Sequence, residues 1–179
     1  EVELRKPSLN ITQLNYGPMH PDTRFSARVA PPMIGLGLLE AIPEEAILAN
    51  AEAQAKAGDG IAGRPNRVWD DAQQKTVLGR FGWKAGQPNL NQQNVHAFSG
   101  DMGLTTSLRP FDDCTDGQTA CKQAPNGNGV DGEPEVSDNI LRLVLFYTRN
   151  LAVPARRDVN AAEVLAGKNL FYQAGCQSC

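Results

Sequence analysis

The stretch GKNLFYQAGCQSC, residues Gly167 to Cys179, decides the fold. It contains a helix-like segment that carries Phe171, then the glycine Gly175, and then Cys176 and Cys179 with two residues between them. Two thiols at this spacing serve three chemistries: a redox dithiol, one half of a zinc site, or the attachment of haem c through two thioether bonds. The cysteine spacing alone leaves all three open.

The residues before the cysteines separate these chemistries. A redox dithiol follows a strand and starts a helix, whose N-terminus lowers the thiol pKa, whereas this pair follows a helical pattern. A zinc site would need a second pair of ligands, and the chain offers none at zinc spacing. Haem c needs C-x-x-C and then a histidine, which would stand directly after Cys179. We therefore predict an incomplete haem-attachment motif, with incidental or disulfide-forming thiols as the alternative.

Composition excludes several classes of partner. The 179 residues include 17 basic and 20 acidic side chains, with no basic run longer than two, so we expect no nucleic-acid partner. No apolar run approaches the roughly 20 residues of a membrane span, and the N-terminus EVELRKPSLN does not resemble a signal peptide. The first residue is not Met and the last is a cysteine in mid-motif, so we expect a segment of a longer polypeptide.

Hydrophobic periodicity and helix signals predict a mainly α-helical, loop-rich fold with a short β-hairpin. The 17 glycines and 12 prolines favour long loops between few regular elements. The expected elements are an extended arm or edge strand over 2–14, a proline-rich loop over 16–33, a buried helical turn over 34–42, a helix from Pro43 to Ala57, a hairpin over 67–83, a helix over 90–99, a long loop over 109–134, and helices over 137–153 and 160–175.

The two C-terminal helices carry the clearest signals. Ser137 suits the N-cap of the first, and its apolar residues occupy more than one face, so we expect this helix to be central and covered on most sides. For the second helix we expect Asn160 as the N-cap and three apolar side chains turned inward, those of Val164, Leu165 and Phe171.

The terminal motif resembles the first helix and attachment site of a class I cytochrome c domain. Five further segments resemble the bacterial di-haem oxidoreductase family, di-haem cytochrome c proteins also labelled "putative peroxidase" and "thiol-oxidoreductase-like". These segments are SARVAPPMIGLGLLEAIPEEAIL, GDGIAGRPNRVWD, LGRFGWKAGQPNLNQQ, AFSGDMGLTT and FYTRNLAVPARR. The similarity is collinear from about Tyr16 to Cys179.

The resemblance implies a cytochrome c-like fold and an inter-haem position. Residues 1–155 would form the inter-haem segment, and residues 156–179 would begin the second cytochrome c domain. It also implies a periplasmic or exported bacterial protein that transfers electrons through two c-type haems, exchanges them with a partner protein and has peroxidase-like activity. Since no complete C-x-x-C-H is present, we expect neither enzymatic activity nor bound haem in this segment alone. The alternative is a non-enzymatic exported binding or scaffold module with structural thiols.

Two further features depend on that resemblance. In an exported protein, Cys114 and Cys121 are expected to form a disulfide that closes an eight-residue ring, worth roughly 2–3 kcal/mol. Two free, partly buried thiols are the alternative. In the family, acidic residues often precede the glycine loop, and in this sequence those residues are missing. Calcium takes six to eight oxygen ligands, and Asp59 alone falls far short of that number, so the sequence does not support a calcium site.

Few residues of this chain could bind a haem iron. His96 lies in a predicted helix beside apolar residues, where a hydrogen-bonded core histidine is the favoured role, and His20 lies in a proline loop that it would tether. Met102 is a candidate thioether ligand, with core packing as the alternative. The other methionines are Met19 and Met33. The sequence therefore names His20, His96 and Met102 as axial-ligand candidates without selecting one.

Two tryptophans and four basic residues complete the candidates. Trp69 and Trp83 could relay electrons between haems, although packing of the hairpin onto the helices is the favoured role. The basic residues could pair with haem propionates, with solvated surface charge as the alternative; they are Arg80, Lys84, Arg156 and Arg157.

Overall fold

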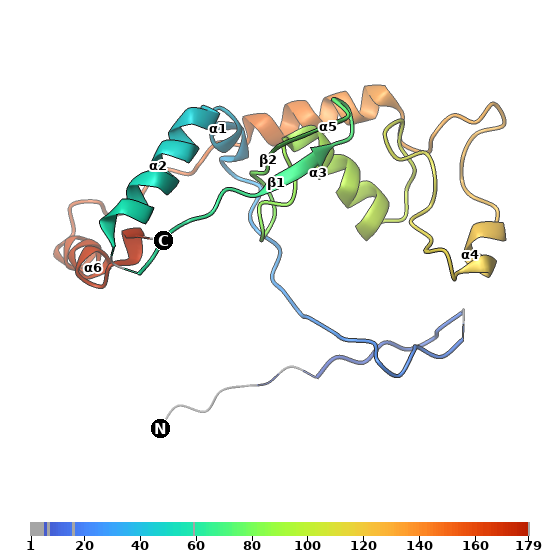
Figure 1. The fold of residues 1–179 in the computed structure, drawn as a ribbon, viewed down its shortest axis with the longest axis horizontal. Coiled ribbons are helices and arrows are strands. Elements are labelled where there is room, and N and C mark those ends of the chain that lie inside the picture. The colour runs from blue at the N-terminus through green and yellow to red at the C-terminus, as the bar shows by residue number, and fades with distance from the viewer. Residues whose placement is uncertain (1–5, 7, 16, 59, 179) are drawn as a thin grey trace.

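The computed structural model of the chain describes residues 6, 8–15, 17–58 and 60–178. These residues form a mainly helical, loop-rich fold with one antiparallel hairpin, which confirms the predicted fold class (Figure 1). The elements are α1 (Leu36–Glu40), α2 (Glu44–Ala57), β1 (Arg67–Asp70), β2 (Lys75–Leu78), α3 (Leu90–His96), the π-helix η1 (Ala97–Asp101), α4 (Thr119–Gln123), α5 (Asp138–Asn150), α6 (Ala162–Gln173) and the 3-10 turn η2 (Cys176–Ser178).

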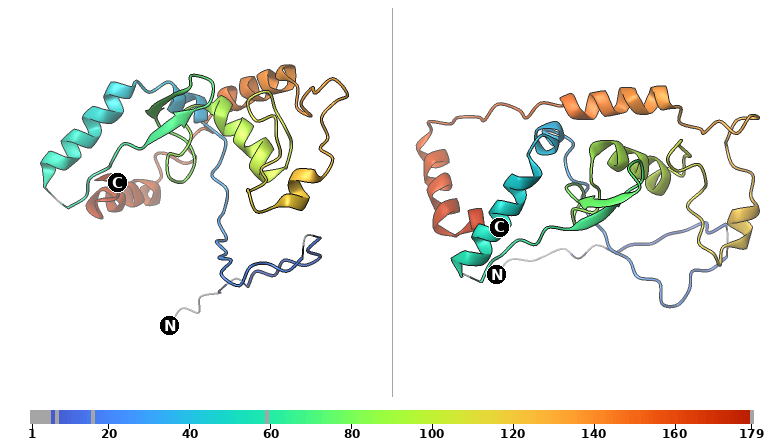
Figure 2. Two further views of the ribbon diagram at one scale, coloured as in Figure 1. Left: turned by 45° about the vertical axis from the view of Figure 1, so that its right-hand side comes forward. Right: turned by 45° about the horizontal axis from the view of Figure 1, so that its top comes forward.

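The chain is extended. Its accessible surface is 14179 Å² for 19.3 kDa, whereas a compact monomer of that mass exposes about 8,500 Å². The difference, about 5,700 Å² by the same scaling, comes from separated parts: α2 and α6 lie on one side of the central elements, the loop with α4 on the other, and the N-terminal segment below (Figures 1 and 2). The surface that stays uncovered includes many large hydrophobic side chains.

The N-terminal segment forms the arm and loop that the sequence predicts. Residues 8–15 and 17–33 contain no helix or strand and run away from the central elements (Figure 1). Their apolar side chains are exposed, including Ile11, Phe25 and Val29. Val2 and Leu4, on which the alternative of an edge strand partly rested, lie outside the described residues.

The next two helices match the expected bounds, with two corrections. Pro43 is the N-cap of α2 rather than its first helical residue, and Gly58 ends the helix in the left-handed region with φ of 69°. The apolar turn at α1 is helical as expected, but it is half-exposed rather than buried, and Leu38 faces solvent. It packs on α5 closely, because a Cβ on Gly37 would stand 2.1 Å from the carbonyl oxygen of Arg149.

The hairpin forms as predicted. Val68 pairs with Val77 and Asp70 pairs with Lys75, and the four residues between the strands form the turn. The Asp70 carboxylate is fully buried and accepts hydrogen bonds from the backbone N–H groups of Ala72 and Gln73 at 3.0 and 2.8 Å. This buried acceptor stabilises the turn, because each of its bonds meets a group that would otherwise lack a partner.

The core lies between α3, α5 and the segment before α5. Val95, Val136 and Leu141 form its buried centre, with Phe98, Leu104 and Leu108 packed against it. The predicted helix from Leu90 forms with Asn89 as its N-cap, whose side chain accepts from the N–H of Gln92. Its last turn widens into the π-helix η1, which was not predicted from the sequence.

The long loop between α3 and α5 is tied at its base. Thr105 is buried, and its backbone N–H donates to the Glu135 carboxylate at 2.9 Å, while the Glu135 N–H donates to the Thr105 hydroxyl at 3.0 Å. The same hydroxyl contacts the side-chain oxygen of Asn128. Because these bonds join the two ends of the loop, they reduce the free segment, and the loop holds α4 away from the core (Figure 2).

Helix α5 begins after Ser137 as predicted, and the Ser137 hydroxyl accepts from the N–H of Ile140. The expectation that α5 is covered on most sides is wrong. Only Leu141 and Thr148 are buried, and its opposite face exposes four large side chains, those of Ile140, Leu143, Phe146 and Tyr147. The physical reason is that no described element packs on that outer face, although α1 and α3 cover the inner one.

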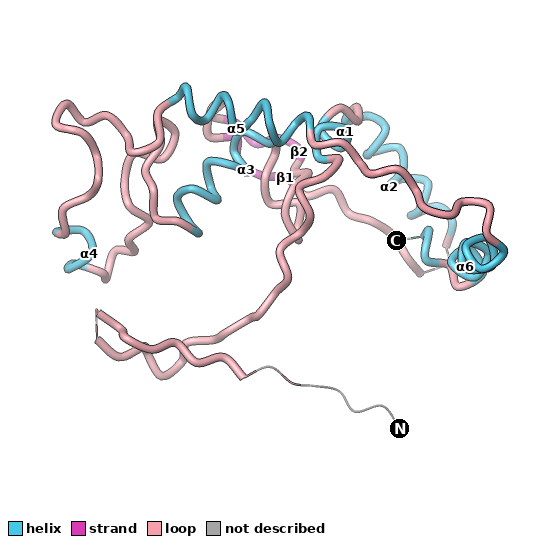
Figure 3. Tube along the Cα trace, turned by 180° about the vertical axis from the view of Figure 1, so that it is seen from behind, coloured by secondary structure: helices cyan, strands magenta, loops and turns pink. Residues whose placement is uncertain are grey.

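Helix α6 has the predicted bounds but different surroundings. Its N-cap is Ala161 without a side-chain bond, so Asn160 is not the cap. The apolar residues expected to face inward, Val164, Leu165 and Phe171, are all exposed, because among the described elements α6 packs mainly against the short η2 turn that follows it. Seen from behind, a linker separates α6 from α5 (Figure 3).

Candidate functional site

The first of the paired cysteines lies on an exposed turn. Helix α6 ends at Gln173, Gly175 takes φ of 73° and reverses the chain, and Cys176 opens the η2 turn with an exposed, unpaired thiol. Only glycine adopts that φ without strain. Cys179 lies outside the described residues. The turn is attached to α2, because the Gln54 amide donates to the Ser178 carbonyl at 3.3 Å.

Exposed aromatic side chains lie next to this turn. Phe171 and Tyr172 contact each other edge to face at 5.7 Å between ring centroids, and both are exposed together with Leu170. A helix with no buried residue gains little from its own packing. The end of α6 therefore presents an exposed thiol beside an apolar surface that the described residues do not cover.

His96, one of the three ligand candidates, has both ring nitrogens occupied. Nδ1 lies 2.9 Å from the Gln87 side-chain nitrogen, and Nε2 lies 3.1 Å from an Asp71 carboxylate oxygen. Gln92 completes the ring of bonds: its Nε2 donates to Gln87 Oε1 at 3.1 Å, and its Oε1 accepts from the Asp71 N–H at 2.8 Å. His96 therefore sits in a closed network that joins α3 to the hairpin.

Two backbone groups set the direction of every bond in this network. The Asp71 N–H can only donate and the Trp69 carbonyl, 2.9 Å from Gln92 Nε2, can only accept, so the Gln92 amide has one orientation. That orientation directs Gln87 Oε1 toward Gln92 and Gln87 Nε2 toward His96. His96 Nδ1 is then an acceptor and Nε2 carries the proton. An iron atom would have to displace one of these bonds to bind His96.

The other two ligand candidates are exposed. His20 lies in the N-terminal loop with its side chain 75% exposed, and its Nδ1 accepts from the Asp22 N–H at 3.2 Å. Met102 follows η1 and is 61% exposed, so its thioether is not part of the core. Of the three candidates only His96 lies in a regular element, since His20 belongs to the N-terminal loop and Met102 follows η1.

The structure also shows the surroundings of the residues proposed to pair with haem propionates or to relay electrons. Arg80 donates to the carbonyl oxygens of Leu39 and Ile42 at 3.4 and 2.5 Å, so it closes the end of α1. Lys84, Arg156 and Arg157 are exposed. Trp69 and Trp83 are exposed as well, so the favoured expectation that they pack the hairpin onto the helices is wrong for their side chains.

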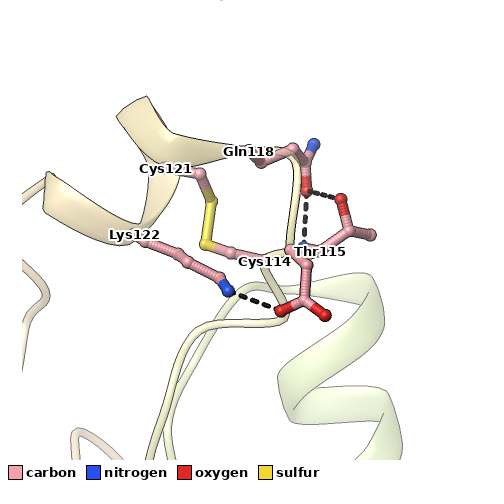
Figure 4. Close-up of a disulfide and its surroundings, with 6 residues drawn as sticks. Cys114, Thr115, Gln118, Cys121 and Lys122 are labelled. Atoms are coloured by element: carbon pink, nitrogen blue, oxygen red, sulfur yellow. Dashed lines mark hydrogen bonds and ion pairs between the residues drawn. A yellow bond between two sulfur atoms is a disulfide. The ribbon is translucent and has the colours of Figure 1, made fainter.

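Cys114 and Cys121 form the expected disulfide (Figure 4). It joins the loop to α4, and two local contacts lie beside it: Lys122 pairs with Asp116 at 2.7 Å, and Gln118 accepts from the Thr115 N–H at 2.8 Å. The eight-residue ring is therefore linked covalently and by polar bonds within itself.

Sequence reasoning missed the polar network around His96. Gln87 and Gln92 lie on both sides of the N-cap Asn89, and the only signal in the sequence is that Gln92 and His96 are four residues apart, on one face of the helix. Within residues 6, 8–15, 17–58 and 60–178, no three His, Cys, Asp or Glu side chains converge as a metal site would require. Nor does any helix of that part have the length and apolar character to cross a bilayer.

Comparison with known proteins assigns the chain to a family. The family described as "Di-haem oxidoreductase, putative peroxidase" matches residues 6–179, nearly the whole chain. No curated protein and no solved structure matches this chain. The match covers the arm, the helical core and the terminal cysteine motif together, and this chain therefore belongs to the di-haem oxidoreductase family.

Proposed function

We propose that this chain is the inter-haem segment of a c-type di-haem oxidoreductase, and that Cys176 and Cys179 form the thioether bonds of one haem. Residues 1–155 would lie between the two haem sites and residues 156–179 would open the second cytochrome c domain. The observation that carries the proposal is the exposed thiol of Cys176 on a turn after α6, in a chain whose family is di-haem.

The residues at the end of α6 fit a covalently attached haem. Thioether formation needs a free, accessible thiol, and Cys176 has one. The macrocycle is largely apolar, and the exposed rings of Phe171 and Tyr172 offer an apolar surface beside that thiol. Gly175, with φ of 73°, lets the chain turn after the helix, and the thiol that follows is exposed. When bound, the haem would supply one-electron chemistry and, in the parent protein, peroxidase-like activity.

The iron ligands require residues beyond these cysteines. A histidine directly after Cys179 would supply one ligand in the parent chain. Among the three candidates within this chain, His96 is engaged on both nitrogens, whereas Met102 has an exposed thioether. We therefore rank Met102 above His96 as a ligand from this segment, and assign His96 to the stability of the hairpin and α3.

The disulfide in the long loop supports the same proposal. The disulfide between Cys114 and Cys121 fits a periplasmic or exported protein, where such bonds persist. A redox protein in that compartment exchanges electrons with a partner protein. The alternative function, a non-enzymatic exported binding or scaffold module, is favoured by one observation, the exposed apolar face of α5.

Haem attachment distinguishes the two functions. The chain, extended by a histidine after Cys179, is produced in a periplasm that has a cytochrome c maturation system. We expect a red protein whose pyridine haemochrome spectrum shows two thioether bonds, and a Cys176→Ser variant with the spectrum of a single thioether bond or no haem. The matched control is Cys114→Ser/Cys121→Ser, which keeps the haem. A colourless product with two free terminal thiols would favour the binding module.

A further inference from the structure

A cavity of about 300 Å³ lies where the end of the N-terminal loop meets the turn after β2 and the end of α3. Its volume is at the lower end of small-molecule sites. Most of the lining is apolar, and two polar side chains interrupt it; the residues that matter for the chemistry are Pro31, Met33, Phe81, Trp83, Gln93 and Asp101. This cavity is separate from the cysteine turn and from the network around His96.

The backbone around the cavity is irregular at two places. Asp101 and Ala97, both in the lining, belong to the π-helix η1. Gly82, also in the lining, has φ of 80°, in the left-handed region. π-Helical turns are rare in proteins, but those that occur are often found at functional sites. The wider turn also displaces side chains that an α-helix would place in line. Irregular backbone therefore forms part of the cavity wall, while Phe98 of the same π-helix packs on the core.

Gln93 has an unsatisfied polar atom at this wall. Its Oε1 is buried and accepts no hydrogen bond from any described residue. Buried side-chain oxygens in native proteins nearly always have a partner, so this one indicates a missing donor. The oxygen lies beside Gly82, where a Cβ would stand 3.7 Å from it. The last side-chain torsion of glutamine is broad, so the amide can turn Oε1 into the cavity.

Charge restricts the molecule that could supply the donor. No Lys, Arg or His is among the described residues that line the cavity, and Asp101 adds a carboxylate at its edge. An anion would be repelled there, whereas a neutral hydroxyl group can donate to Gln93. Trp83 lines the cavity and is 64% exposed, so its indole is accessible to an aromatic ring that enters there.

We propose that this cavity binds small phenolic molecules, with the ring against Trp83 and Met33 and the hydroxyl group donating to Gln93 Oε1. The proposal goes beyond the proposed function, because such binding requires neither haem nor the terminal cysteines. If phenol does not bind, the proposal of haem attachment still stands, and if no haem is attached, the proposal of phenol binding still stands.

The test uses the 179-residue chain with Trp69→Phe, which leaves Trp83 as the only tryptophan. Phenol, anisole and benzoate are titrated while the fluorescence of Trp83 is recorded at an excitation wavelength that phenol does not absorb. Anisole keeps the ring but lacks the hydroxyl proton, and benzoate keeps the ring but carries a negative charge. We expect phenol to bind about 2- to 10-fold more tightly than anisole, and benzoate to bind most weakly.

Two variants test whether the preference for phenol over anisole depends on Gln93. Gln93→Leu should remove the preference for phenol over anisole, whereas Gln123→Leu, an exposed glutamine on α4, should leave it unchanged. If Gln93→Leu does not fold, NMR of the unmutated chain replaces it: phenol should shift the methyl signals of Ala30 and Ala97, which line the cavity. Equal affinities for phenol and anisole, tighter binding of benzoate, or shifts confined to other residues would overturn the proposal.

Discussion

Replacing His96 by leucine separates a structural histidine from an iron ligand. The ring of His96 joins α3 to the hairpin through bonds of 2.9 Å to Gln87 and 3.1 Å to Asp71. Leucine fills similar space but offers neither bond. We therefore expect His96→Leu to lower the free energy of unfolding and to leave a haem spectrum unchanged.

The magnitude follows from the two bonds and their exposure. The side chains of His96 and Asp71 are 27% and 20% exposed, so water can partly replace the lost partner. A typical buried or half-buried hydrogen bond contributes about 0.5–1.5 kcal/mol, and the loss of two gives about 1–3 kcal/mol. The matched control is His20→Leu, because His20 is the only other histidine and is exposed. That change should cost less than about 0.5 kcal/mol.

The assay is urea unfolding at neutral pH followed by tryptophan fluorescence. A lower midpoint with an unchanged slope reports a loss of stability rather than a change in the unfolded state. The same two variants are then made in the chain extended by histidine and loaded with haem. The reasoning would be refuted if His96→Leu kept the midpoint of the unmodified chain, or if it altered the Soret band while His20→Leu did not.

Four further predictions concern the same framework. In a ¹⁵N–¹H correlation spectrum, His96 should show the tautomer with its proton on Nε2, because the Gln92 amide is oriented by two backbone groups; a proton on Nδ1 would contradict the network. Glu40→Ala should cost about 2 kcal/mol in urea unfolding, since Glu40 accepts from the Leu90 N–H at 2.9 Å and from Arg149 at 2.5 Å and so links α1, α3 and α5; Glu44→Ala, whose partner Arg67 is exposed, is the control. Gly37→Ala should cost about 1–3 kcal/mol, because its Cβ would collide with the Arg149 carbonyl, whereas Gly167→Ala has open space and should not destabilise. Reducing the Cys114–Cys121 disulfide should cost about 2.5 kcal/mol, measured as unfolding with and without reductant; an equal midpoint in both would show that the ring is already ordered by its polar contacts.

Local signals in the sequence predicted the elements well. Helix α2 ends at Ala57, Ser137 caps α5 and the hairpin forms within residues 67–83, each as expected, because caps and hairpins depend on residues a few positions apart. The two errors at caps, Pro43 and Asn160, are shifts of one residue, since the same residue types are favoured on either side of a helix start.

Burial could not be predicted in the same way. The apolar residues of α5 and α6 suggested covered helices, yet Phe146 is 68% exposed and α6 buries nothing. Hydrophobic pattern shows which side chains would gain from burial, but it does not show whether the chain supplies a surface to cover them. Here the described residues leave that surface open.

The sequence by itself determined the family, the helical class, the hairpin and the pair of cysteines at the end of α6. Tertiary structure alone decided the role of His96, because its two partners come from positions 71 and 87, separated from it by a turn and a loop. It also decided the cavity beside Trp83, which joins residues near 31, 82 and 97. Local propensity acts over a few residues, whereas the direction of a side-chain hydrogen bond depends on which distant backbone groups the fold brings against it.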